Sequence, residues 1–245
     1  MDKLVYLAAQ AAKNTMRRQE NIANNLANVS TPGFRSELMA FRSAPILGGD
    51  GNAMAYSMES TVGFDTTPGQ IRSTSRDLDV AIQGDGWFSI TAPDGNEAYT
   101  RSGSFQINAE GNLVDNSGNA VIGTEGPINI PADHRVSIED NGTITAIPLQ
   151  GQGGIVQLGQ LKLVNPDPKT MKRSEDGFFR VEGGNPAEDD PNVRVASGFV
   201  EMSNVNAVEA MVSMIEAQRS FDTQMKMISA AKDNGDAANR LFGMN

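Results

Sequence analysis

Residues 205–232 read VNAVEAMVSMIEAQRSFDTQMKMISAAK, and the fold of the whole chain depends on what this stretch becomes. Its apolar side chains recur at helical spacing with charged side chains between them, which predicts an amphipathic helix with a narrow apolar stripe. Asn206 and Glu209 form a capping-box pattern at its start. At ~1.5 Å per residue the helix is about 40 Å long, and a stripe this thin needs a partner helix in the same chain or in another. We assign six residues to the stripe: Val208, Met211, Val212, Ile215, Met225 and Ile228.

The N-terminal segment offers a second helix for this pairing. Between Asp2 and Asn28, apolar and small residues again fall on one helical face. Pro32 disfavours the α conformation at Thr31, and Pro32–Gly33 is typical of a type II turn, so the helix is predicted to end there. The predicted face consists of Leu4, Leu7, Ala8, Ala11, Ala12, Thr15, Ile22 and Leu26.

The end of this N-terminal helix has an unusual composition. Residues 21–28 contain four asparagines, although asparagine is a mediocre helix former. Two interpretations remain open. The segment is either a fraying helix end, or a place where small alanines and hydrogen-bonding asparagines pack closely against neighbouring helices and fix their register.

The chain between the two helices has a different pattern of apolar and turn-forming residues. Short apolar runs alternate with turn sequences such as Pro93–Asn96 and Asp140–Gly142, which indicates an antiparallel β domain. Residues 34–55 lack this pattern and are expected to be irregular or weakly extended, with a flexible loop at Gly48–Asn52. The predicted fold class is α+β, with the N- and C-terminal helices paired as a coiled coil and a central antiparallel β-rich domain. The predicted divisions are a helix in 1–30, an extended segment in 31–74, the β domain in 75–202 and a helix in 203–245.

Composition excludes several classes of function. The net charge is −10 with a pI of about 4.6, and nearly all of the negative charge lies between the helices, which argues against nucleic acid or an anionic membrane as a partner. The absence of cysteine removes disulfides, thiolate zinc sites and cysteine nucleophiles. Because no apolar run is long enough to cross a membrane and no cleaved secretory signal is recognisable, we expect no membrane insertion. The protein is then either cytoplasmic or exported by a route that needs no cleaved signal.

The sequence offers few candidates for chemistry. The loops Asp94–Glu97 and Asp115–Asn119 contain oxygen ligands but lack the spacing of a calcium loop, so hairpin turns explain them better. Asp77 and Asp79 are spaced to share a strand face, where a solvated surface is a better explanation than a catalytic dyad. His134 is the only histidine, which disfavours catalytic triads and histidine metal sites. We therefore predict no enzymatic activity and no catalytic, cofactor or metal site.

Three segments carry a family resemblance when they are taken together. The first is ANNLANVSTPGFR at 23–35, the second is SRDLDVAIQGDGWF at 75–88 with YTRSG at 99–103, and the third is SNVNAVEAMV at 203–212, continuing to Arg219. Their order and spacing resemble those of the axial proteins of the bacterial flagellum, the rod and hook subunits. The resemblance covers nearly the whole chain, and within the family residues 211–226 are most similar to the proximal rod subunit.

This resemblance implies a structural function. In such proteins the two terminal helices form the innermost domain of a tube of stacked subunits, the segment after the Thr31–Gly33 turn bridges subunits, and the β domain faces outward. The implied partners are copies of the chain, the neighbouring proximal and distal rod proteins, and the flagellar type III export apparatus. The implied location is the rod in the periplasm, where it transmits motor torque. The implied interface comprises Leu4, Ala8, Ala11, Ile22, Asn24, Asn25, Leu26, Asn28, Thr31, Pro32, Gly33, Phe34, Val208, Met211, Val212, Ile215, Arg219, Met225 and Ile228.

Two alternatives to a proximal rod subunit are kept. The first is a distal rod subunit of the same family. The second, from another class, is a secreted β-rich adhesin or binding protein with helical oligomerisation ends, which requires an aromatic ligand surface. One departure from the family pattern is Asp233–Asp236, where Gly235 costs roughly 1 kcal/mol relative to alanine in a helix. We expect the last turns of the C-terminal helix to be kinked or loosely held.

Overall fold

The two terminal segments form the long helices that their sequences predict. The computed structural model describes residues 2–47, 53–149 and 154–242, with side chains described outside 1–4, 41–62, 150–153, 238–239 and 241–245. Helix α1 spans Asp2–Ala27 and helix α2 spans Ala207–Phe242. The Asn206 side chain caps α2, because its Oδ1 accepts hydrogen bonds from the N–H groups of Val208 (3.1 Å) and Glu209 (3.3 Å). The helix continues through Gly235 without ending there.

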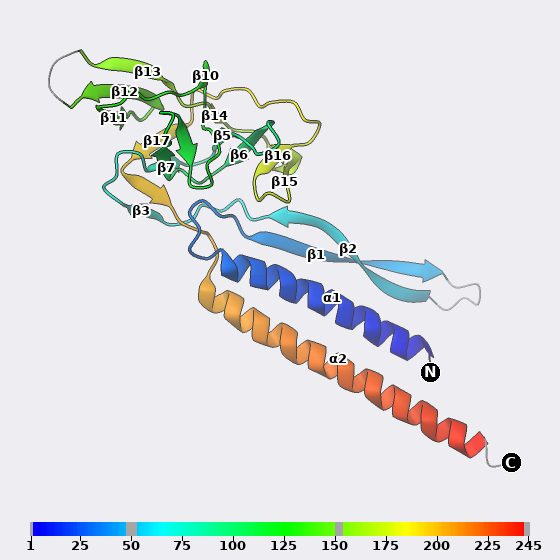
Figure 1. Ribbon diagram of the computed structural model, residues 1–245. Coiled ribbons are helices and arrows are strands. Elements are labelled where there is room, and N and C mark those ends of the chain that lie inside the picture. The colour runs from blue at the N-terminus through cyan, green and yellow to red at the C-terminus, as the bar shows by residue number, and fades with distance from the viewer. Residues whose placement is uncertain (1, 48–52, 150–153, 243–245) are drawn as a thin grey trace. The chain divides into compact units, whose positions relative to one another are not determined.

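The chain divides into two units, and each is described by itself. The helical unit consists of Met1–Val29, Ser36–Asp65 and Val205–Asn245. The β unit consists of Ser30–Arg35 and Thr66–Asn204. Within the helical unit α1 contacts α2, as predicted, and it also contacts a two-stranded hairpin, so that α1 lies between the two (Figure 1).

That hairpin corrects the expectation for residues 34–55. Strand β1 (Glu37–Leu47) pairs antiparallel with β2 (Ala53–Phe64), from Glu37 opposite Phe64 to Leu47 opposite Ala53, with an irregularity between Leu38 and Ala40. The sequence shows no clean alternation of polar and apolar residues here. The two strands are instead held together by hydrogen bonds between their backbone N–H and C=O groups. The loop predicted at Gly48–Asn52 lies outside the described residues.

The β unit is the predicted antiparallel domain. A five-stranded sheet has the order β14-β5-β6-β16-β15, and a three-stranded sheet has the order β11-β12-β13. Further two-stranded pairs are β3 with β18, β4 with β17, β7 with β8 and β9 with β10, and every pair is antiparallel. The strands are β3 (Ile71–Ser73), β4 (Val80–Gln83), β5 (Trp87–Thr91), β6 (Glu97–Thr100), β7 (Phe105–Ile107), β8 (Leu113–Asp115), β9 (Ile122–Gly123), β10 (Gly126–Pro127), β11 (His134–Ile138), β12 (Thr143–Pro148), β13 (Val156–Gln160), β14 (Leu163–Val164), β15 (Met171–Arg173), β16 (Phe179–Val181), β17 (Arg194–Ser197) and β18 (Phe199–Glu201); a short 3-10 helix, η1, spans Pro168–Thr170.

The core of the β unit is centred on β4 and β5. Residues 87–90 of β5 are buried on both faces, so Trp87–Phe88 is a core strand as the sequence indicates. The Phe88 ring meets the edge of Phe105 with centroids 5.2 Å apart, and aliphatic residues from most of the unit surround this pair. The predicted turns carry their glycines in the left-handed region, for example Gly95 with φ 82° and Gly142 with φ 83°.

Candidate assembly interface

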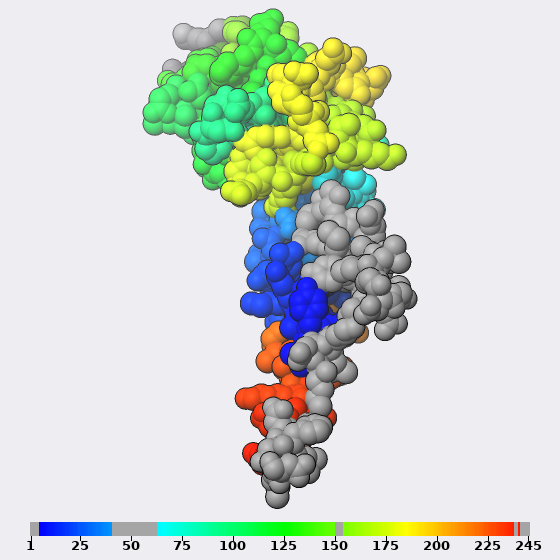
Figure 2. All heavy atoms as spheres, turned by 90° about the vertical axis from the view of Figure 1, so that its right-hand side faces the viewer, coloured from blue at the N-terminus to red at the C-terminus, as the bar shows by residue number. Residues whose placement is uncertain are grey.

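The contact between α1 and α2 uses a seam in which alanines alternate with larger side chains. The less exposed positions of α2 recur three and four residues apart, and Ala217 among them is only 3% exposed. Opposite them, Ala8, Ala12 and Ile22 are the buried residues of α1. One polar pair crosses the seam, because Gln224 Nε2 donates to Thr15 Oγ1 (3.1 Å). The α2 residues of this seam are Ala210, Met214, Ala217, Phe221, Gln224, Ile228 and Ala231. In the space-filling view, the C-terminal part of α2 (orange and red) emerges beyond α1 (blue) (Figure 2).

The apolar stripe predicted on α2 lies on a different face from this seam. Only Ile228 belongs to both sets, and it is half-buried. Met225 is 46% exposed, and Arg219 beside the stripe is exposed. Four side chains in the first two turns form an exposed apolar face at spacing i, i+3, i+4, i+7, with exposed fractions of 71% for Val208, 53% for Met211, 51% for Val212 and 52% for Ile215. The pattern found an apolar face correctly, but the α1 contact is made by another face of α2, whose most buried residue is Ala217.

The asparagines near the end of α1 hold the hairpin. Asn25 Oδ1 accepts from the Glu37 N–H (2.9 Å), and Asn25 Nδ2 donates to the Glu37 carbonyl (3.1 Å). Asn21 Nδ2 donates to the Glu37 carboxylate (3.2 Å). The helix is regular to Ala27, and within the chain the Asn21 and Asn25 amides bind strand β1 rather than a neighbouring helix.

The remaining residues of the predicted α1 interface are distributed over several environments. Ala8 and Ile22 are buried, and Ala11, Leu26 and Asn28 are half-buried, whereas Asn24 is exposed. Asn28 Nδ2 donates to the Asn24 carbonyl (3.0 Å). The Leu4 side chain lies outside the described side chains.

The turn after α1 is built into the β unit. Gly33 has φ 69°, the Phe34 N–H donates to the Thr31 carbonyl (3.3 Å), and the turn therefore has the hydrogen bond and positive φ expected of type II. A Cβ at Gly33 would lie 2.2 Å from the backbone nitrogen of Ser102, so only glycine fits. Phe34 is buried beneath the guanidinium of Arg173, 4.4 Å from its ring centroid. Thr31 is exposed and Pro32 half-buried, so of this turn only these two residues offer surface to a neighbour.

A buried cluster of charges follows this turn, and no pattern in the sequence indicates it. We call Arg35, Arg101 and Glu201 the Arg–Glu–Arg cluster. Glu201 Oε1 lies 2.9 Å from Arg35 Nη2, and Glu201 Oε2 lies 2.6 Å from Arg101 Nη2. All three side chains are 4% exposed or less. Arg35 and Arg101 occur within family motifs, but Glu201 follows an apolar pair with no local pattern, so no signal in the sequence connects the three.

Backbone groups complete the cluster. The Gly69 N–H donates to Glu201 Oε1 (2.9 Å), and Arg35 Nη1 donates to the Thr67 carbonyl. Arg101 donates to the carbonyls of Gly86 (2.6 Å) and Gly84 (2.9 Å). Two arginines and one glutamate leave one excess positive charge, which these carbonyl dipoles offset.

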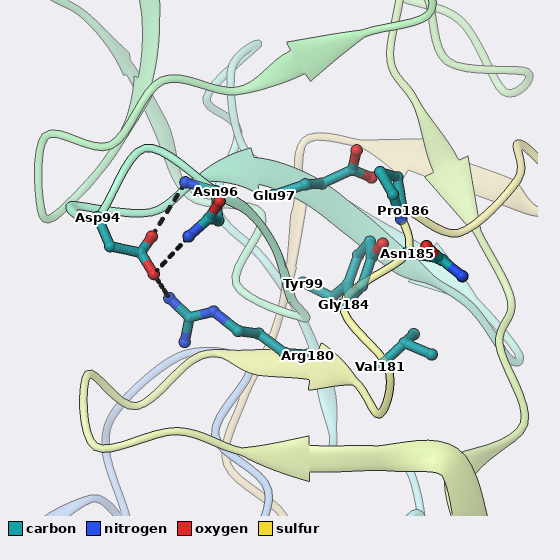
Figure 3. Close-up of a pocket in the computed structure, with 9 residues that line it drawn as sticks. All are labelled: Asp94, Asn96, Glu97, Tyr99, Arg180, Val181, Gly184, Asn185 and Pro186. Atoms are coloured by element: carbon teal, nitrogen blue, oxygen red, sulfur yellow. Dashed lines mark hydrogen bonds and ion pairs between the residues drawn. The ribbon is translucent and has the colours of Figure 1, made fainter.

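The β unit also contains a polar pocket of about 300 Å³ (Figure 3). Its charged groups already have partners, since Asp94 accepts from Asn96 (3.1 Å) and Arg180 (3.1 Å), and Glu97 binds Lys162 (2.8 Å). Hydrogen bonds from Asn96 lower the pKa of Asp94 below its usual value. Burial raises the pKa of Tyr99, whose hydroxyl accepts from the Ala187 N–H (2.6 Å). The pocket is lined by Asp94, Asn96, Glu97, Tyr99, Arg180, Val181, Gly184, Asn185 and Pro186.

The two aspartates considered for chemistry have structural partners. Asp79 is buried and accepts from Ser104 Oγ (3.0 Å), which corrects the expectation of a solvated face there. Asp77 binds Arg135 (2.6 Å), whose hydrogen bond lowers the pKa of Asp77. Over the described residues, no three His, Cys, Asp or Glu side chains gather in a way that would hold a metal ion.

Comparisons with known proteins give the same class of protein as the sequence motifs indicate. Residues 6–35 match the family described as flagella basal body rod protein, 81–146 the flagellar hook protein FlgE/F/G D1 domain, and 196–241 the flagellar basal body rod FlgEFG protein C-terminal. The architecture and these matches define a structural protein of the flagellar rod and hook class, not an enzyme.

Full-length relatives narrow the class. The chain is 43% identical, over 100% of both sequences, to the flagellar basal-body rod protein FlgF of Escherichia coli K12 and, to the same extent, to that of Salmonella typhimurium LT2. A FlgG protein of Buchnera aphidicola from Acyrthosiphon pisum is 35% identical over 86% of this chain and 88% of its own length. The chain belongs to the FlgF family of flagellar basal-body rod proteins, the proximal rod subunits. Neither the distal rod alternative nor the adhesin alternative therefore holds.

Membership of this family has two direct consequences. The protein is located in the flagellar basal-body rod, and it assembles with other rod subunits.

Within 2–47, 53–149 and 154–242, the helices lack the combination of length and apolar character that crossing a bilayer requires.

Proposed function

We propose that the chain polymerises through its terminal helices, with copies of itself and with neighbouring proximal and distal rod proteins, into the periplasm-spanning shaft that transmits motor torque. The observation that carries this proposal is the exposed apolar face of α2, formed by Val208, Met211, Val212 and Ile215. Fully burying a side chain of this size contributes about 1.5–3 kcal/mol, so contact with a neighbouring helix supplies a substantial driving force. The seam with α1 leaves this face free for such a contact.

The predicted interface residues divide into two groups under this proposal. The residues of the exposed face, together with Met225, Arg219 and Asn24, contact neighbouring subunits. The buried residues, such as Ala8, Gly33 and Phe34, act indirectly by fixing the shape of the subunit.

A charge placed in the exposed face tests the proposal. Val212 is exposed in the free subunit, so Val212→Asp should leave the fold of the monomer unchanged. The new carboxylate lies where a neighbour has to pack, so rods should be missing and cells non-motile. Ser220→Asp, at an exposed position on another face of the same helix, is the matched control and should leave rods and motility intact. Far-UV circular dichroism checks that both monomers are folded. Normal rods in the Val212→Asp strain would contradict the proposed interface.

We further propose export through the flagellar type III apparatus without cleavage of a signal, delivering the chain to the rod in the periplasm. The absence of cysteine supports this route, because a chain threaded unfolded into an oxidising space risks wrong disulfides. Mass spectrometry of the protein taken from purified basal bodies should show an intact N-terminal peptide. A shorter mature N-terminus would overturn this route.

A further inference from the structure

We propose that the Arg–Glu–Arg cluster is the mechanical joint of the subunit, at which force from the helical unit enters the β unit. This inference rests on the proposed function, since it assigns to named residues the transfer of torque through one subunit. It concerns only the β unit and the covalent connections that leave it.

The first argument comes from the path of the chain. The main chain passes between the two units four times, after residues 29, 35, 65 and 204. Any force carried along the backbone from one unit to the other must pass through these connections. On the β-unit side, each connection begins in one of three short segments, 30–35, 66–70 and 201–204.

The second argument is that the cluster ties these three segments together. Arg35 belongs to the first segment, its partners Thr67 and Gly69 to the second, and Glu201 to the third. Arg101, by contrast, belongs to the sheet domain itself and is anchored on the carbonyls of Gly84 and Gly86. Glu201 therefore links the connecting segments to the body of the β unit through one carboxylate.

Backbone hydrogen bonds between the same segments reinforce the joint. The Gly33 N–H donates to the Glu201 carbonyl (2.8 Å), and the Met202 N–H donates to the Gln70 carbonyl (2.9 Å). The Asn204 N–H donates to the Phe34 carbonyl (3.3 Å), and the Asn204 side-chain Nδ2 donates to the Thr67 carbonyl (3.0 Å). The segments also touch closely, because a Cβ at Gly69 would lie 1.9 Å from the Met202 carbonyl oxygen.

The chemistry of the cluster suits a joint better than apolar packing does. Apolar contacts are non-directional and slide under shear, whereas charge-assisted hydrogen bonds with fixed donor geometry hold one arrangement. Desolvation of the buried charges offsets much of their attraction, so such a cluster contributes little net stability. The cluster and its partners include residues of all three connecting segments, which indicates a role in fixing the geometry of these segments.

Native-state hydrogen exchange on the purified full chain tests the joint directly. In Glu201→Gln the amides of Gly33, Met202 and Asn204 should exchange roughly tenfold faster or more, whereas Ser89 and Thr91 in β5 should keep their protection. Glu97→Gln is the matched control, because it removes a carboxylate from an ion pair with Lys162 in the same unit that touches none of the connecting segments. A uniform loss of protection across the β unit, or no change at all, would overturn the proposal.

A second variant covers the case in which Glu201→Gln does not fold. Arg35→Lys keeps the charge, but an ammonium on a flexible stem cannot reproduce the fork that binds both Glu201 and the Thr67 carbonyl. Faster exchange should then appear at Gly33 and Asn204 with β5 unaffected, and unchanged exchange at both amides would count against the joint.

Motility under load separates the joint from the proposed function. In a strain lacking the chromosomal copy, the wild-type chain should restore rods and swimming, and its failure to do so would remove the proposed function itself. With the Arg35→Lys chain, rods should assemble and cells swim in dilute buffer but stall as the viscosity of the medium rises. If these cells swim like wild type at every viscosity, the joint proposal fails while the rod function stands.

Discussion

Gly33 and Glu201 define how single residues shape the β unit. Gly33 adopts a positive φ and presses its backbone against Ser102, while its N–H meets the Glu201 carbonyl. Neither residue presents a surface to a partner, because both are buried. Their contribution is to hold residues 30–35 in one conformation within the β unit.

Substitution at Gly33 tests this contribution. Gly33→Ala should destabilise the β unit by about 1–3 kcal/mol or more, because a Cβ meets backbone atoms and the positive φ disfavours alanine. Chemical denaturation followed by Trp87 fluorescence measures the change. Gly154→Ala is the control, since a Cβ there meets open space, and it should be close to neutral. Equal stability of the two variants would contradict the packing at Gly33.

Acid should weaken the surface ion pairs of the β unit. Burial raises the pKa of Asp176, but hydrogen bonds from Arg180 and the Phe178 N–H outweigh it, so the folded pKa lies below the usual value of about 3.8. A carboxyl with a depressed folded pKa stabilises the fold above its unfolded pKa and loses that contribution as pH falls through the folded pKa.

We therefore expect the urea midpoint of the β unit to be steady from neutral pH to about pH 5 and to decline below about pH 4. Arg180→Gln should make this decline shallower, and the difference should be modest because these groups are partly exposed to solvent. A midpoint that rises on acidification would contradict the sign of the shift.

At the scale of elements, α2 presents two faces with different compositions. The seam with α1 combines three alanines with Met214, Phe221, Gln224 and Ile228. The exposed face carries only aliphatic side chains and lies near the start of the helix. A helix with two such faces can hold its own α1 and a neighbouring subunit at the same time.

Enlarging a residue in the seam tests how closely the helices pack. Ala217→Leu should force α1 and α2 apart and cost about 1–3 kcal/mol by overpacking. Ala230→Leu makes the same change at an exposed position of α2 and should have little effect. Thermal unfolding followed by helical circular dichroism compares the two, and identical melting curves would place Ala217 outside the seam.

At the scale of the whole molecule, the two units differ in how much apolar surface they bury. In the described part of the chain, the buried residues of the helical unit are small or few, whereas the β unit has a large aliphatic and aromatic core. The stabilities of the units should differ accordingly, because burial of apolar area is the main source of stability.

Two probes can follow the units separately in the free subunit. Far-UV circular dichroism at the helical signal reports mainly α1 and α2, and the only tryptophan, Trp87, reports the β unit. On heating, the helical signal should fall before the fluorescence of Trp87 changes. Coincident transitions would show that the units unfold together and would contradict this difference in stability.

The sequence alone determined the features that depend on near neighbours along the chain. The ends of α1, the Asn206 cap, the hairpin turns and the core strand at Trp87 all follow from residues within a few positions of one another. The motifs were specific enough to indicate the flagellar rod class. Local preferences and turn chemistry are sufficient for these features.

Only the tertiary structure decided which distant segments meet. It placed the β1–β2 hairpin against α1, packed α1 on the face of α2 that contains Ala217, and buried Glu201 against Arg101, one hundred positions away in the sequence. These outcomes depend on the partner that each group finds, because a buried charge or an unpaired strand is stable only once that partner is in place. No pattern within a short window contains that information.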